Sequence, residues 1–204
     1  MTEPEVSLVP TPHGDARVHL LRPADDPVGL MMLGHGAGGG VTAADLRLAS
    51  EEALRLGLEV ALVEQPYRVA GRKAPAPPAQ VDAAWRAVVE HLHREGPLVV
   101  GGRSFGSRVA CRTSADVGAS GVLCLAFPLH PPGRPEKTRL PELAAVMVPT
   151  LIVQGERDSF GVPDAKTLPS GHTLVVVDGD HSLKKDAPAI RGAISGWLTG
   201  VLSG

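Results

Sequence analysis

Short runs of consecutive apolar residues alternate along this chain with longer segments in which apolar residues recur at helical spacing. The short runs are continuously apolar, as expected for strands covered by helices on both faces. They predict strands at 17–21, 29–33, 59–63, 98–100, 121–126, 150–153 and 173–177. The longer segments predict helices at 43–56, 79–95, 105–116, 140–146 and 187–202. This alternation predicts an α/β fold with a mostly parallel central sheet and helices on both faces.

The ends of the predicted helices carry recognisable signals. Thr42 is a candidate N-cap for the helix at 43–56, and Gly57 stops that helix. The pair Gly96-Pro97 ends the helix at 79–95. A chain of 204 residues has the length of one domain with a sizeable core, so we expect a single domain over residues 1–204.

Composition and charge exclude several classes of protein. Apolar residues make up 43% of the chain and the formal net charge is -2, so we expect no nucleic-acid partner. No apolar stretch reaches the length of a membrane span, and residues 1–10 lack the basic region and apolar run of a signal peptide. Cys111 and Cys124 lie in apolar patterns typical of buried free thiols. We therefore expect a cytoplasmic protein with no membrane partner.

A Gly-x-Ser-x-Gly motif runs from Gly102 to Gly106, with Ser104 at its centre. It follows an apolar strand and precedes a predicted helix, which is the context of a nucleophile elbow. In such a turn the glycines leave room for a sharply reversed backbone. The alternative is an ordinary strand-to-helix turn, because glycine and serine are common residues.

Two further residues complete a candidate triad. Asp158 follows the strand at 150–153 and His181 follows the strand at 173–177. Loops after the carboxyl ends of parallel strands meet at one edge of a sheet, so Ser104, Asp158 and His181 are expected to lie together. Serine needs a base to take its proton, histidine has the pKa for that base, and a carboxylate orients the imidazole.

Other residues compete for two of these roles. Glu156 and Asp164 are alternative carboxylates, but Asp158 lies at the expected offset past its strand. His172 is the alternative base, but it precedes the last strand and so lies at the opposite end of the sheet. We therefore favour Asp158 and His181.

A glycine-rich turn, Gly-His-Gly-Ala-Gly-Gly-Gly, spans residues 34–40 after the strand at 29–33. The backbone N–H groups of Ala37 and Phe105 are the candidate oxyanion hole. The alternative is a phosphate-binding loop, but the turn lacks a Gly-Lys-Ser/Thr ending and a Gly-x-Gly-x-x-Gly pattern. Histidines are scattered without metal-ligand spacing, so we expect neither a metal nor an organic cofactor.

These motifs resemble those of small α/β-hydrolases of the dienelactone-hydrolase-like group. The resemblance rests on the Gly-Gly-Arg-Ser-Phe-Gly elbow, Phe-Pro-Leu-His-Pro-Pro-Gly at 127–133, Glu-Gln-Pro-Tyr at 64–67 and Gly-Asp-His-Ser-Leu at 179–183. It covers nearly the whole chain, with one departure at Ser107, where a second small glycine is expected. The resemblance implies an α/β-hydrolase fold. The group also includes a member inside a chromatin-modifying complex, which leaves a non-catalytic role open.

Four aromatic residues follow four different predicted strands. Tyr67, Phe105, Phe127 and Phe160 are therefore candidates for an apolar pocket around Ser104, or for plugs at the sheet edge. Trp85 and Trp197 lie in helix patterns and are expected in the core. The basic residues near the same edge could bind an anionic substrate group or simply be solvated. They are Arg68, Arg72, Lys73, Arg103 and Arg134.

The segment between the strands at 121–126 and 150–153 is too short for a helical lid domain, so we expect an open site. The favoured function is a serine hydrolase acting on small to medium esters or thioesters. The alternatives are a hydrolase or peptidase acting on another bond, and a protein-interaction subunit that keeps the fold. The sequence does not indicate the natural substrate or the oligomeric state.

Overall fold

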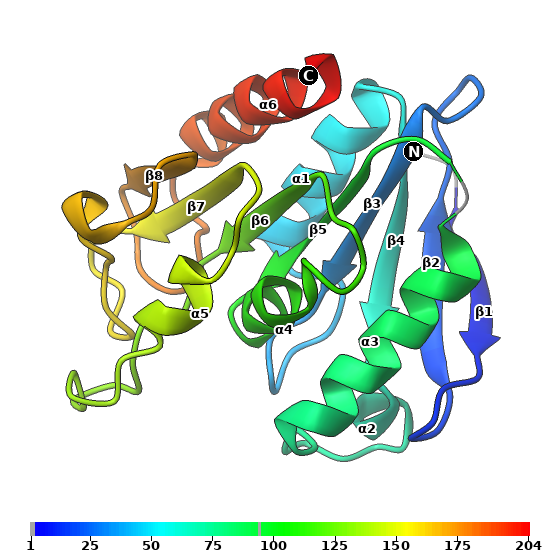
Figure 1. Ribbon diagram of the computed structural model, residues 1–204, viewed down its shortest axis with the longest axis horizontal. Coiled ribbons are helices and arrows are strands. Elements are labelled where there is room, and N and C mark those ends of the chain that lie inside the picture. Colours follow the sequence, from blue (N-terminus) through cyan, green and yellow to red (C-terminus); the bar gives the residue numbers. More distant parts are fainter. Residues whose placement is uncertain (1–2, 94) are drawn as a thin grey trace.

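Eight strands form one sheet in the part of the chain that the computed structural model describes, residues 3–93 and 95–204 (Figure 1). In chain order the strands are β1 (Glu5–Val9), β2 (Ala16–Leu21), β3 (Gly29–Gly34), β4 (Leu58–Glu64), β5 (Leu98–Arg103), β6 (Gly121–Leu125), β7 (Thr150–Gly155) and β8 (His172–Val177). The helices are α1 (Ala44–Arg55), α2 (Pro66–Val69), α3 (Pro78–Leu92), α4 (Phe105–Thr113), α5 (Leu140–Ala144) and α6 (Ala187–Ser203). A 3₁₀ turn, η1, spans Ala165–Thr167.

The order of the strands across the sheet is β1-β2-β4-β3-β5-β6-β7-β8. The strands from β4 through β8 pair in parallel, whereas β2 is antiparallel to both β4 and β1. The parallel strands all end at the same edge of the sheet. The loops that follow β3, β5, β7 and β8 therefore meet there, which places distant segments of the chain in one site.

Helices cover both faces of the sheet (Figure 1). On one face α1 and α6 pack together, and Leu46 and Ile194 are buried there in the same hydrophobic cluster as Met31 and Leu33 of β3. On the other face α3 and α4 pack together over Met32. Burial on both faces explains why the strands read as continuous apolar runs.

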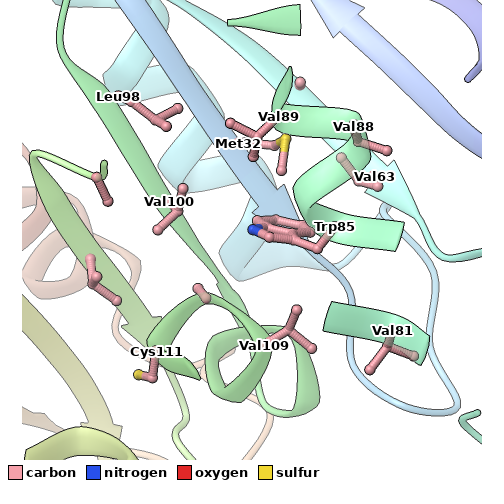
Figure 2. Packing of buried hydrophobic residues seen from close by; sticks show 14 of the residues in the cluster. Met32, Val63, Val81, Trp85, Val88, Val89, Leu98, Val100, Val109 and Cys111 are labelled. Atoms are coloured by element: carbon pink, nitrogen blue, oxygen red, sulfur yellow. The ribbon is translucent and has the colours of Figure 1, made fainter. Parts of the chain in front are cut away.

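Trp85 is the largest side chain of the core and is completely buried. Figure 2 shows its ring between Met32 of β3 and Val109 of α4, with Val81 and Val88 on the same helix. A Cβ atom added to Gly34 would lie 3.3 Å from this ring, so the indole supports the end of β3. The packing of α3 is thus connected to the edge of the sheet where the loops after β3 and β5 meet.

The predicted α/β fold is confirmed, with differences at the ends of elements. The edge strand β1 and the short helix α2 were not predicted, because both are short and β1 is exposed along most of its length. Thr42 is not the N-cap of α1, since Ala43 holds that position in extended conformation without a side-chain bond. The helix α4 ends at Thr113 rather than at residue 116.

Two sequence predictions extend beyond the described residues. The predicted helix at 79–95 is observed as Pro78–Leu92, and Arg94 lies outside the described residues. Met1 and Thr2, part of the segment read for a signal peptide, also lie outside them. No helix in the described part of the chain is long and apolar enough to cross a membrane.

The segment between β6 and β7, which the structure describes in full, contains only the short helix α5 and therefore holds no lid domain. Glu142 of α5 forms ion pairs with Arg108 and Arg112 of α4, at 2.6 and 3.6 Å. These contacts hold α5 against the side of α4. The expectation of a fold without a lid is therefore confirmed.

Candidate active site

Ser104 lies at the sharp turn between β5 and α4. Its backbone has φ 51° and ψ −110°, a conformation that costs a non-glycine residue about 1–3 kcal/mol. The turn ends β5 at Arg103 and starts α4 at Phe105, so Ser104 is the N-cap of the helix. The motif is therefore a strand–turn–helix elbow, as its sequence context predicts.

Close backbone contact with β3 explains the glycines of the elbow. A Cβ atom on Gly102 would lie 2.4 Å from the carbonyl oxygen of Gly34, and one on Gly106 would lie 2.3 Å from it. Gly102 also has φ 159°, at the margin of the region that favours glycine. Because the blocking atoms belong to backbone, they cannot move aside as a flexible side chain could.

Hydrogen bonds connect the three candidate triad residues. Ser104 Oγ lies 2.9 Å from His181 Nε2, and His181 Nδ1 lies 2.8 Å from Asp158 Oδ2. The Asp158 side chain is fully buried, while that of His181 is 20% exposed. The order Oγ–Nε2–Nδ1–Oδ2 allows the imidazole to take a proton from serine while the carboxylate holds its other nitrogen.

Asp158 is held by two further donors. The backbone N–H of Phe160 donates to Oδ1 at 2.8 Å, and the side-chain amide of Gln154 donates to Oδ2 at 2.7 Å. Gln154 is itself fully buried on β7, and its amide nitrogen also reaches the carbonyl oxygens of Phe127 and Gly161. Gln154 therefore fixes both the carboxylate and the two loops beside it.

The alternative residues are engaged elsewhere. Glu156 pairs with Arg157 at the surface, and Asp164 Oδ1 accepts a bond from the backbone N–H of Lys166. His172 Nε2 lies 3.1 Å from the Leu143 carbonyl oxygen, at the start of β8. Of these carboxylates, only Asp158 is bonded to the His181 imidazole.

The glycine-rich turn after β3 is held by His35. The backbone N–H of Gln65 donates to His35 Nε2 at 3.1 Å, so Nδ1 carries the proton and donates to the Gly36 carbonyl oxygen at 2.8 Å. Burial lowers the pKa of His35, which keeps this imidazole neutral. The N–H of Gly39 donates to the same oxygen. In the trans peptide between Gly36 and Ala37, the Ala37 N–H points away from the side on which the Gly36 carbonyl oxygen accepts these bonds.

Tyr67 supports the next peptide of this turn. Its hydroxyl donates to the Ala37 carbonyl oxygen at 2.9 Å, and its ring lies edge-on to those of His35 and Phe105. Burial raises the pKa of Tyr67 to about 12, so the hydroxyl keeps its proton. Gly36 adjoins the elbow, because a Cβ atom there would lie 3.8 Å from the Cβ of Ser104.

The expected aromatic pocket is only partly correct. Phe127 is fully buried in the core, and Tyr67 is 1% exposed and borders a cavity of only about 10 Å³, in agreement with the alternative of plugs at the sheet edge. Phe105 and Phe160 are partly exposed beside the site. The Phe160 ring packs on the His181 imidazole with 4.2 Å between their centroids. Strand order does not reveal which way a loop side chain points, so the sequence did not predict that the Phe127 and Tyr67 rings are buried.

An apolar cleft of about 400 Å³ lies elsewhere, between the start of α1 and strands β2 and β4. Its walls include Leu21, Val41 and Leu62, and it does not border Ser104 or His181. It is therefore separate from the hydrogen-bonded site.

The basic residues near the sheet edge differ in their partners. Arg72, Lys73 and Arg134 are exposed to solvent, and Arg68 is partly buried. Arg103 pairs with the buried carboxylate of Asp45, with 3.0 Å between Nε and Oδ2. Arg103 is therefore neutralised by the protein itself.

Sequence reasoning missed the supporting roles of His35, Gln154 and the Tyr67 hydroxyl. The sequence signals for two of them were polar residues within or directly after an apolar strand: Gln154 interrupts the apolar run of β7, and His35 directly follows β3.

Among the described residues, no group of three or more His, Cys, Asp or Glu side chains is arranged to hold a metal ion. Cys111 and Cys124 are free and buried as predicted, with their sulfur atoms 3.5 Å apart.

Comparison with known families agrees with this geometry. A family model described as an alpha/beta hydrolase domain matches residues 27–189, which include the glycine-rich turn, the elbow and His181. The chain belongs to this family. The predicted resemblance to dienelactone-hydrolase-like proteins is thereby supported at the level of the family and the fold.

Solved structures with the same fold cover almost the whole chain. An α/β serine hydrolase without a lid from Xanthomonas campestris is 23% identical, with a TM-score of 0.77 over 100% of this chain and 97% of that one. Est1E from Butyrivibrio proteoclasticus is 14% identical, with a TM-score of 0.78 over 98% and 99%. A dienelactone hydrolase from Anabaena variabilis is 17% identical, with a TM-score of 0.76 over 98% and 100%. This α/β-hydrolase thus shares their architecture.

The elbow contact predicts opposite effects for two Gly→Ala substitutions. Gly106→Ala should lower the free energy of unfolding by about 3 kcal/mol, because the new methyl group would overlap the Gly34 backbone. Gly196→Ala is the matched control, since no atom lies within 4 Å of the added Cβ in α6. It should raise stability by about 0.5–1 kcal/mol. Denaturant unfolding measures both changes, and an unaltered Gly106→Ala protein would disprove the close contact.

Proposed function

We propose that this protein is a serine hydrolase that cleaves carboxylic esters or thioesters of small to medium size by acyl transfer. A single domain spanning residues 1–204 would carry the activity. The observation that supports the proposal best is the hydrogen-bonded chain from Ser104 through His181 to Asp158, at 2.9 and 2.8 Å. Its location on an elbow of the alpha/beta hydrolase family adds further support.

Ser104 is the proposed nucleophile and His181 its base. His181 Nε2 takes the hydroxyl proton as Oγ attacks the carbonyl carbon of the substrate. The negative charge that develops on the carbonyl oxygen is bound by the N–H groups of Ala37 and Phe105. His181 then donates its proton to the leaving alcohol or thiol, and an acyl-serine remains.

Water completes the cycle by the same route. His181 accepts a proton from the attacking water, and the second tetrahedral intermediate collapses to release the acid and free Ser104. Asp158 keeps the imidazole in the tautomer that has a free Nε2 and stabilises the imidazolium that forms in each half-reaction. The mechanism uses protein groups alone, so the proposal includes no metal or organic cofactor.

The proposed substrate is a small molecule, and we propose no nucleic-acid or membrane partner and a cytoplasmic location. Phe105 and Phe160 are the partly exposed aromatic side chains at the site, and they would contact an apolar acyl group. The protein-interaction alternative predicts a folded chain whose serine does not react, whereas the peptidase alternative predicts a reactive serine that also hydrolyses peptide bonds.

Ser104→Ala should abolish covalent labelling by a fluorophosphonate and lower the esterase rate by about a thousandfold or more, because the nucleophile is removed. Ser195→Ala, on α6, is the matched control and should label and turn over as the unaltered protein does. Labelling is read by intact mass and the rate with a nitrophenyl ester. An unchanged rate in folded Ser104→Ala would refute the assignment. A parent protein that is folded but never labelled would favour the interaction subunit.

Asp158→Asn should lower kcat on the order of 10³–10⁴-fold, because an amide nitrogen beside His181 Nδ1 would reverse the tautomer of the imidazole. Glu156→Gln changes the rival carboxylate in the same loop, which pairs with Arg157 at the surface, and should alter kcat less than twofold. Steady-state kinetics of both variants on one ester decides whether Asp158 or Glu156 is the acid. Loss of activity in Glu156→Gln with full activity in Asp158→Asn would assign the acid to Glu156.

A site without a lid predicts that the preference for longer acyl chains in the substrate is limited. Each buried methylene contributes about 0.8 kcal/mol, but the contact area ends where the chain passes Phe105 and Phe160 into solvent. We expect kcat/KM on nitrophenyl esters to rise over the first few carbons and then level off or fall. A series from acetate to dodecanoate tests this. A steady rise to the longest chain, with activation at a lipid interface, would contradict it.

A further inference from the structure

Arg103 connects the elbow to the loop that carries His181. It is the last residue of β5, directly before Ser104, and its Nη2 donates to the backbone carbonyl oxygen of His181 at 2.8 Å. Its Nε lies 3.0 Å from Oδ2 of Asp45, in the first turn of α1. One guanidinium therefore links β5, α1 and the loop after β8.

The loop that carries His181 begins at the end of β8, far from the end of β5 where Ser104 lies. In the sheet, β8 is separated from β5 by β6 and β7. Strands lie about 4.8 Å apart, so the end of β8 is about 14 Å from the end of β5. The loop must lean across two strand ends for His181 to reach Ser104. The bond from Arg103 holds the backbone of this loop on the side where the serine lies.

Asp45 fixes the guanidinium in that orientation. Its carboxylate is fully buried, and its Oδ1 accepts a bond from the backbone N–H of Leu46 at 2.9 Å. Burial raises the pKa of Asp45, and the adjacent Arg103 opposes that rise. The pair also borders the glycine-rich turn, because a Cβ atom on Gly36 would lie 3.3 Å from Arg103 Nη1.

We propose that Arg103, oriented by Asp45, is a positioning residue that sets the distance between His181 and Ser104. This inference rests on the proposed function for its effect on rate, but not for its effect on the loop. Arg103 does not touch the reacting atoms. Its role needs the planar guanidinium, because a single ammonium group cannot keep both the contact of Nε with Asp45 and that of Nη2 with His181.

Displacement of a catalytic group by about 1 Å can cost on the order of 10²-fold in rate. Arg103→Met should therefore lower kcat about 10–100-fold per labelled serine, with KM changed less than about threefold. Arg103→Lys should fall between the parent protein and Arg103→Met. Counting active molecules by phosphonate labelling removes the effect of any unfolded fraction.

A double substitution separates positioning from the cost of a buried charge. Arg103→Met alone leaves the Asp45 carboxylate buried without its partner, which destabilises the protein. Adding Asp45→Asn should recover much of the melting temperature but not the lost kcat. Recovery of kcat together with stability would show that Arg103 only neutralises Asp45 and would overturn the proposal.

Arg112→Met is the matched control. Arg112 forms a similarly buried pair with Asp82, at 2.6 Å, but contacts neither His181 nor Ser104. Its loss should lower the melting temperature and leave kcat per labelled serine within twofold of the parent value. An equal loss of kcat in Arg112→Met and Arg103→Met would indicate a general effect of lost ion pairs and would also overturn the proposal.

Amide hydrogen exchange tests the loop without relying on activity. Residues 178–183 should exchange faster in Arg103→Met than in the parent or in Arg112→Met. If the parent protein neither labels nor hydrolyses esters, the proposed function fails while this measurement still judges the role of Arg103. Unchanged exchange in the loop would refute the positioning role.

Discussion

The contact between Gly34 and the elbow is the constraint on which the site depends. The carbonyl oxygen of Gly34 lies where a side chain on Gly102 or Gly106 would have to be, so β3, β5 and the start of α4 meet backbone to backbone. This contact brings the turn after β3 beside Ser104. It also requires the strained backbone of Ser104, which the surrounding core must hold in place. Trp85 packs beneath the same glycine and contributes to that support.

Buried polar side chains position the site in the absence of a lid. Gln154 holds Asp158, His35 orients the peptide before Ala37, and Arg103 holds the loop of His181. Each is bonded to backbone atoms, Gln154 and Arg103 also contact a buried carboxylate, and each comes from a different loop or strand. A polar group that loses its partner inside a protein is costly, so these bonds define one arrangement of the loops. The site can therefore be ordered while it remains open to solvent.

Sequence patterns predicted the sheet, most of the helices and the residues now found hydrogen-bonded at its edge. This succeeded because the positions of Ser104, Asp158 and His181 follow from strand ends, which apolar runs mark clearly. The directions of Phe127 and Tyr67 could not be predicted, because they depend on how each loop folds back over the core. The pairing of Arg103 with Asp45 was also hidden, since it joins segments that only the finished sheet brings together. The strand β1 lacked a buried pattern that could reveal it.

The backbone of Ser104 would also connect the proposed reactivity of this residue to folding. Its positive φ persists only while β3, β5 and α4 are packed together, so a chain that has collapsed without this packing contains an ordinary serine alcohol. The appearance of a reactive serine during refolding would therefore mark the final closure of the elbow rather than the earlier formation of helices. The rate at which Ser104 becomes reactive would then report the rate of the last packing step in folding.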